Sequence, residues 1–138
     1  MIQTYGKSQC YQLGNQSSTK DHFSYPFTVP LLQQQQQQQM NDIVDIACCQ
    51  YLNVVLYSDN TIVIWGQFSE SSPPFEQPYS ITCFKSRNKW IKNIACTRNE
   101  IYVCCEREVY QIHIRYSTGK TIIDSQSYLN SYNSCWFN

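Results

Sequence analysis

The sequence predicts an all-β fold made of short antiparallel hairpins. β-Branched and aromatic residues gather in short runs bounded by polar residues, and one set of these runs recurs after about 47 residues. No window of about 11 residues or more has a convincing helical period. Internal periods of about 40 to 50 residues, with several short strands in each unit, are typical of β-propeller blades. We therefore expect blade-like sheets.

The first predicted group of strands begins with the short apolar run Ile43–Cys48. Residues 54–57 and 61–65 follow, and both runs are rich in β-branched and aromatic side chains. An Asp-Asn pair ending at Asn60 separates them, and Asn tolerates the left-handed backbone that tight hairpin turns require. Gly66 then permits a sharp exit from the hairpin.

The second predicted group repeats this order. Residues 90–96 correspond to the first strand and residues 101–104 to the second. A turn is predicted at 106–108 and a further strand at 109–114. One more strand is predicted in the tail, at 121–124.

Two segments are predicted to be surface loops, one between the two groups and one before the first. Residues 67–79 are rich in Ser and Pro, which favours an irregular connection. The glutamine run 33–39 is interpreted as an insertion in a loop, because loop-closure entropy grows slowly with length and such an expansion costs little stability.

The repeat resembles a known family. Val44–Cys48 lies over Lys92–Cys96 at an offset of 48, and Asp59–Val63 lies over Glu106–Tyr110 at an offset of 47. Both units resemble RCC1-like repeats (regulator of chromosome condensation). The first unit matches the pattern of that family through Tyr5-Gly6, Tyr11-Gln12-Leu13-Gly14, Phe27-Thr28-Val29-Pro30, Val44-Asp45-Ile46-Ala47-Cys48, Val54-Val55-Leu56-Tyr57 and Asp59 to Gly66. Tyr11 and Cys49 stand where the family usually has Gly.

The resemblance implies an incomplete propeller. It covers one full repeat at 5–66 and a degraded one at 65–113, so residues 1–120 form the repeat region and 121–138 a tail. Propellers of this family have seven blades, and two repeats cannot close such a ring. The open edges leave three arrangements: a fragment of a longer product, a piece completing another chain's propeller, or a small open β structure lying on a large assembly.

Composition limits the classes of function. A chain of 138 residues is enough for one modest domain, and its formal net charge of zero disfavours broad electrostatic binding of nucleic acid or anionic membrane. Only 14% of residues are charged, so little like-charge repulsion opposes association. This suits a subunit covered by partners, although a compositional habit of the source genome explains it equally well.

The eight cysteines are expected to be reduced thiols. Most lie in apolar strand-like runs, where they serve as small buried hydrophobes, and no signal peptide is recognised at the start of the sequence. We therefore expect an intracellular, reducing location without membrane insertion: the cytoplasm, a cytoplasmic assembly such as the cytoskeleton or a cilium, or the nucleus.

The sequence contains no constellation that indicates catalysis. His22 and His113 are far apart, the adjacent cysteines do not have the spacing of zinc ligands, and there is no glycine-rich phosphate loop. We expect no enzymatic activity, no metal and no cofactor.

A basic cluster around Trp90 is the main candidate for binding. It contains Lys85, Arg87, Lys89, Lys92 and Arg98. Basic residues interleaved with an aromatic ring bind RNA or phosphates, dock on acidic protein surfaces, or simply form a solvated loop. Further candidate partner-binding residues are Tyr11, Trp136 and Phe137, whereas Trp65 is expected to lie in the core.

These observations favour a non-catalytic structural or adaptor subunit that binds other proteins of a large complex, including another propeller fragment. The alternatives are a nucleotide-exchange regulator of a small GTPase, which the family resemblance suggests, and an RNA- or ribonucleoprotein-binding subunit that uses segment 85–98.

Overall fold

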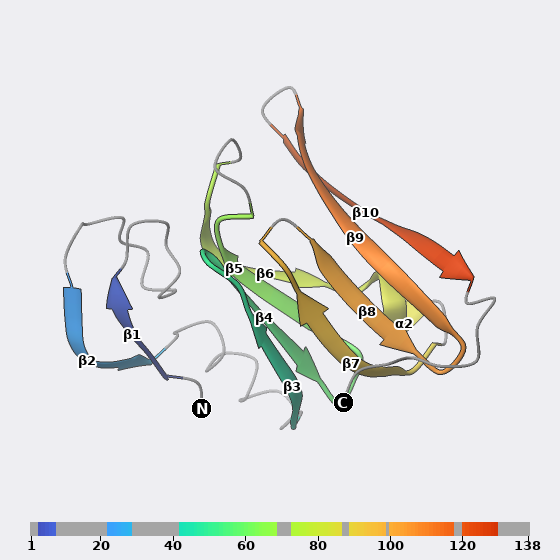
Figure 1. The fold of residues 1–138 in the computed structure, drawn as a ribbon, viewed down its shortest axis with the longest axis horizontal. Helices are drawn as coiled ribbons and strands as arrows, with labels where there is room; N and C mark the ends of the chain where they lie inside the picture. Colours follow the sequence, from blue (N-terminus) through green and yellow to red (C-terminus); the bar gives the residue numbers. More distant parts are fainter. Residues whose placement is uncertain are drawn as a thin grey trace.

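The described part of the chain forms three antiparallel sheets (Figure 1). A computed structural model describes residues 3–7, 22–28, 42–68, 73–86, 89–98, 100–117 and 120–129. The two-stranded sheet pairs β1 (Gln3–Lys7) with β2 (His22–Thr28). The first four-stranded sheet has the order β3 (Ile43–Cys48), β4 (Leu52–Tyr57), β5 (Ile62–Gly66) and β6 (Phe75–Ile81). The second has the order β7 (Ile91–Cys96), β8 (Ile101–Cys105), β9 (Glu108–Ser117) and β10 (Lys120–Leu129).

These sheets confirm the predicted all-β class. The only helix in the described ranges is the four-residue α2 (Cys83–Ser86), which connects the two large sheets. Within the same ranges, no helix has the length and apolar character needed to cross a bilayer. The two four-stranded sheets lie side by side, and they do not close a ring (Figure 1).

The hairpin between β4 and β5 turns as its sequence predicts. Asn60 has a φ of 62°, the left-handed conformation that Asn tolerates. Its N–H donates to the carbonyl of Tyr57 at 3.0 Å, and the N–H of Thr61 donates to the carboxylate of Asp59 at 3.0 Å. A three-residue loop with a left-handed third residue is a favoured way to close a hairpin.

The loop prediction for 67–79 is wrong at its end, because residues from Phe75 onward form β6. β6 pairs with β5 through Ile81, Ser80 and Tyr79 and is the edge strand of its sheet. An edge strand tolerates Pro78, since a missing N–H on the outer side breaks no pair in the ladder. The Ser- and Pro-rich composition therefore concealed a strand.

The strand predicted at 121–124 is confirmed and is longer than expected. β10 pairs with β9 over the full length of both strands, from Lys120 opposite Ser117 to Leu129 opposite Glu108. The resulting ribbon, orange to red in Figure 1, extends well beyond β7 and β8. In each large sheet, the fourth strand lies outside the group of strands that the sequence predicted for that sheet. β6 lies between the two predicted groups, and β10 lies largely in the predicted tail.

A hydrophobic core fills the space between the two large sheets. It is built by apolar side chains from both sheets and from α2, including Leu56, Ile64, Phe84, Val103 and Ile112. The first sheet also buries its opposite face, where a second cluster contains Val55, Tyr57, Val63 and Trp65. Trp65 is 1% exposed, as expected for a core residue.

Candidate functional site

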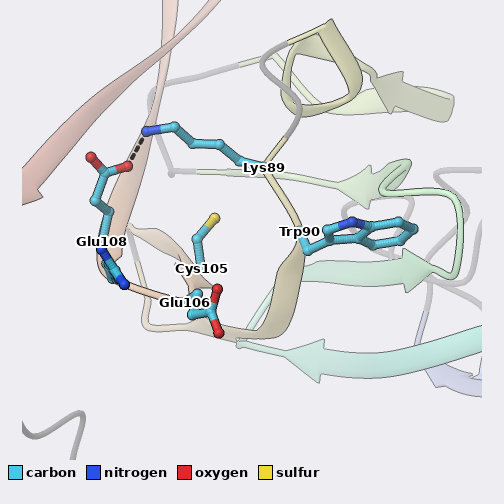
Figure 2. Close-up of a pocket in the computed structure, with 6 residues that line it drawn as sticks. Lys89, Trp90, Cys105, Glu106 and Glu108 are labelled. Atoms are coloured by element: carbon cyan, nitrogen blue, oxygen red, sulfur yellow. Dashed lines mark hydrogen bonds and ion pairs between the residues drawn. The ribbon is translucent and has the colours of Figure 1, made fainter.

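A pocket lies at one end of the second sheet, where β7 begins. Ile91 pairs with Cys105, so the two residues before β7 lie beside the turn that joins β8 to β9. The pocket has a volume of about 300 Å³. We call it the Trp90 pocket, and it is lined by Lys89, Trp90, Cys105, Glu106, Arg107 and Glu108 (Figure 2).

An ion pair crosses the Trp90 pocket. Lys89 and Glu108 point toward one another in Figure 2, and the ammonium donates to Glu108 Oε2. Lys89 also donates to the hydroxyl of Tyr110 at 2.5 Å, and that hydroxyl donates to Glu108 Oε2 at 2.6 Å. The hydrogen bonds with Glu108 and then Tyr110 raise the pKa of Lys89, and the bonds with Lys89 and Tyr110 lower the pKa of Glu108. Both groups are therefore charged at neutral pH.

The ring of Tyr110 connects this ion pair to the core. Lys89 Nζ lies 5.2 Å from the centroid of that ring, within the range of a cation–π contact. On the core side, Tyr110 meets Phe84 of α2 edge to face, with centroids 5.3 Å apart and an interplanar angle of 77°. The position of the lysine is consequently fixed by buried aromatic packing as well as by charge.

Asn60 of the first sheet holds the backbone of the pocket. Its side-chain amide donates to the carbonyl of Lys89 at 3.0 Å and accepts from the N–H of Ile91 at 3.1 Å. Both bonds bracket Trp90, which lies between these two residues. Asn60 is 8% exposed, so its side chain is shielded from competing water. A turn of one sheet thereby orients the segment around Trp90 in the next.

Trp90 itself projects into solvent. The side chain is 68% exposed, and Figure 2 shows it directed away from the Lys89–Glu108 pair. Among the exposed large hydrophobic residues that the structure describes, Trp90 has the highest exposure, and its backbone is held from both sides. It is well suited to contact with another molecule.

The charges that line the pocket balance. Two cationic and two anionic side chains line it, so it has no formal net charge. Burial, with smaller contributions from neighbouring groups, raises the pKa of the Cys105 thiol, which therefore stays protonated and weakly nucleophilic. No group of three or more His, Cys, Asp or Glu side chains within the described ranges is arranged to hold a metal ion.

The structure brings together only part of the predicted basic cluster. Lys89 and Trp90 line the pocket, whereas Lys92 lies exposed in β7 and Arg98 lies exposed beyond that strand. Lys85 belongs to α2, with its side chain outside the described set. Arg87, Tyr11, Trp136 and Phe137 lie outside the described residues.

Two features of this site have no local signal in the sequence. Residues 106–108 were interpreted only as a turn, and the ion pair across 19 positions leaves no local signal. Asn60 was assigned to its own hairpin, and its contacts lie 29 and 31 positions away. The repeat alignment placed Asp59–Val63 over Glu106–Tyr110, which could have indicated that both turns occupy corresponding ends of neighbouring blades.

Comparison with known proteins supports the fold. No protein-family model matches the chain, and no curated protein matches it. Among solved structures, the chain is similar to yeast RCC1 (Prp20) in a crystal structure of Kap60 bound to that protein, with a TM-score of 0.61 and 15% identity. The match covers 88% of this chain and 31% of that chain, so this chain spans less than a third of the length of the other. The expected fold of about two RCC1-type blades is confirmed.

Proposed function

We propose that the chain is a non-catalytic adaptor in a larger protein assembly and that it binds a partner protein at the Trp90 pocket. The observation that carries this proposal is the presentation of Trp90, exposed to 68% while Asn60 holds the backbone on both sides. A fixed backbone lowers the entropy lost on association, and Trp is enriched among residues that dominate binding energy.

The charges around the indole favour a protein over RNA as the partner. Lys89 already has an anionic neighbour in Glu108, and the exposed Glu106 would repel phosphates. A neutral rim of mixed charges around an aromatic anchor resembles the composition of protein interfaces. The RCC1 protein of the similar structure is itself bound to another protein, Kap60.

An intracellular, reducing location forms part of the proposal. The six cysteines that the structure describes are thiols, with no disulfide among them. The location rests on the sequence, in which most cysteines lie in apolar strand-like runs as small buried hydrophobes.

The test compares the proteins that co-purify with the tagged wild-type chain, with Trp90→Ala and with Tyr116→Ala. Tyr116 is a suitable control because it is an aromatic residue with 54% exposure in β9, outside the Trp90 pocket. Once a direct partner is purified, we expect it to bind Trp90→Ala at least about 10-fold more weakly than the wild type. We expect Tyr116→Ala to bind this partner as tightly as the wild type does.

Three results would contradict the proposal. The first is that Trp90→Ala binds the partner as tightly as the wild type. The second is that the chain binds only RNA and that this binding depends on Trp90. The third is that the chain stimulates nucleotide release from a small GTPase and that Trp90→Ala removes this activity. A melting curve for each variant establishes that the fold is retained before binding is compared.

A further inference from the structure

Two thiols meet between the blades, at the end of β7 farthest from the Trp90 pocket. β3 packs against β7. Asp45 of β3 reaches the N–H of Ile94, and four residues later Cys49 reaches Cys96, the last residue of β7. The N–H of Cys49 donates to the carbonyl of Leu52 at 2.9 Å, so the turn after β3 holds the backbone of Cys49.

The two sulfur atoms share a hydrogen bond. The thiol of Cys96 donates to the sulfur of Cys49, and both side chains are half-buried and packed against the core between the sheets. This bond, helped by backbone groups of the turn and opposed by burial, lowers the pKa of Cys49 to about 6. The same bond and burial raise the pKa of Cys96. The shared hydrogen bond therefore favours a thiolate on Cys49 and the proton on Cys96.

We propose that Cys49 and Cys96 are a redox modification site, which a small disulfide such as oxidised glutathione converts into an intramolecular disulfide that links the two blades. This inference does not depend on partner binding at Trp90. Three of the other described cysteines are less suited. Cys104 and Cys105 are buried, and burial followed by the charge of Cys49 raises the pKa of the exposed Cys48.

The reaction is a two-step thiol–disulfide exchange. The Cys49 thiolate attacks one sulfur of oxidised glutathione, forming a mixed disulfide and releasing one glutathione thiolate. Cys96 then loses its proton to solvent, and its thiolate attacks the Cys49 sulfur. The Cys49–Cys96 bond forms, the bond to glutathione breaks and the second glutathione leaves. Two electrons pass from the protein thiols to the small disulfide, which is reduced to two glutathiones.

The product would be a disulfide cross-link between the two large sheets. The bond closes a loop of about 50 residues, and a disulfide over a loop of this length restricts the unfolded chain more than the folded one. We therefore expect oxidation to raise the melting temperature by roughly 5–15 °C, reversibly on addition of dithiothreitol.

The test uses the full reduced chain, freed of reductant and treated with oxidised glutathione. Digestion with trypsin and chymotrypsin without reduction, followed by mass spectrometry, identifies the linked peptides. Cys96 lies in the tryptic peptide 93–98, which contains no other cysteine. The expected main product is the Cys49–Cys96 link within one chain, with the rise in melting temperature.

Three variants sharpen the test. Cys49→Ser and Cys96→Ser should each lose the link and the rise in melting temperature, and the neighbouring control Cys48→Ser should keep both. The proposal is overturned if Cys96 pairs with Cys48, if the main links join different chains, or if Cys49 stays as a mixed disulfide. In the wild type, fragmentation of the linked peptide between Cys48 and Cys49 identifies the pairing cysteine, and non-reducing electrophoresis separates links within one chain from links between chains. The test therefore holds even if a variant does not fold.

Discussion

The carboxylate of Asp45 accepts a hydrogen bond of 2.9 Å from the backbone N–H of Ile94, which joins the first strands of two neighbouring sheets. Its second oxygen accepts from the N–H of Ile46 at 2.9 Å. One side chain of β3 thereby satisfies a backbone donor of β7. Two other residues of the first sheet contact β7: Asn60 at the start of the strand and Cys49 at its end. The contact of Asp45 lies between them.

Asp45→Ala should destabilise the packing of the two sheets. The variant leaves the N–H of Ile94 without its acceptor in a mostly buried position, which costs about 1–3 kcal/mol of unfolding free energy. Asp45→Asn keeps a neutral acceptor and should cost less. Urea unfolding measures both, with the exposed Asp124→Ala as the control. Equal stability of Asp45→Ala and Asp124→Ala would show that the contact contributes nothing.

Substitution of Asn60 should separate its two roles. Asn60→Gly keeps the left-handed backbone and loses both hydrogen bonds to the Trp90 segment, whereas Asn60→Ala loses the bonds and adds strain at a φ of 62°. We expect Asn60→Gly to cost about 1–3 kcal/mol and Asn60→Ala about 1 kcal/mol more. Chemical denaturation gives the unfolding free energies. Acrylamide quenching of tryptophan fluorescence, compared with the same variant carrying Trp90→Phe, isolates the Trp90 signal from those of Trp65 and Trp136. If Asn60→Gly matched the wild type in both measurements, the bonds would have no role in holding the segment.

Gly66→Ala should be among the most damaging single substitutions in the first sheet. Gly66 has a φ of 102°, and a Cβ there would lie 2.0 Å from the carbonyl oxygen of Tyr51. That carbonyl also accepts from the N–H of Gln67 at 2.8 Å, so it cannot move away without losing a bond. We expect the free energy of unfolding to fall by more than about 2 kcal/mol, as measured by thermal and urea unfolding. The exposed Ser58→Ala is the control, and a comparably small loss in both variants would contradict the steric argument.

Tyr57→Phe should stabilise the protein slightly at neutral pH and more strongly at alkaline pH. The hydroxyl is buried without a hydrogen-bond partner among the described residues. Removing it should raise the unfolding free energy by about 1 kcal/mol.

Burial and then the charge of Asp59 raise the pKa of Tyr57 to about 12. Between about pH 10 and 12 the unfolded chain therefore releases this proton while the folded chain keeps it, and wild-type stability falls. Urea midpoints at pH 7, 10 and 11 should diverge between the wild type and Tyr57→Phe. The exposed Tyr116→Phe should follow the wild type, and parallel pH curves for all three proteins would refute the assignment.

Local patterns predicted much of the fold. Ile43–Cys48 was predicted with the bounds that β3 has, because a short apolar run with polar flanks is a strong strand signal. The turn at Asn60 followed from the conformational tolerance of its side chain. β6 was missed, since a Pro-containing edge strand resembles a loop in composition and its pairing depends on β5 being present.

The sequence by itself determined the repeat, its RCC1-like character, the strand class and the aromatic residue at the candidate site, because these depend on residue type and on spacing along the chain. Only the tertiary structure decided that Lys89 is paired with Glu108, that Asn60 holds the Trp90 segment and that Cys49 meets Cys96. Each of these contacts joins positions 19 to 47 residues apart, and the last two cross from one sheet to the other. Which side chains face one another there depends on how two twisted sheets pack, and that packing is set by the whole shared core and not by any local pattern.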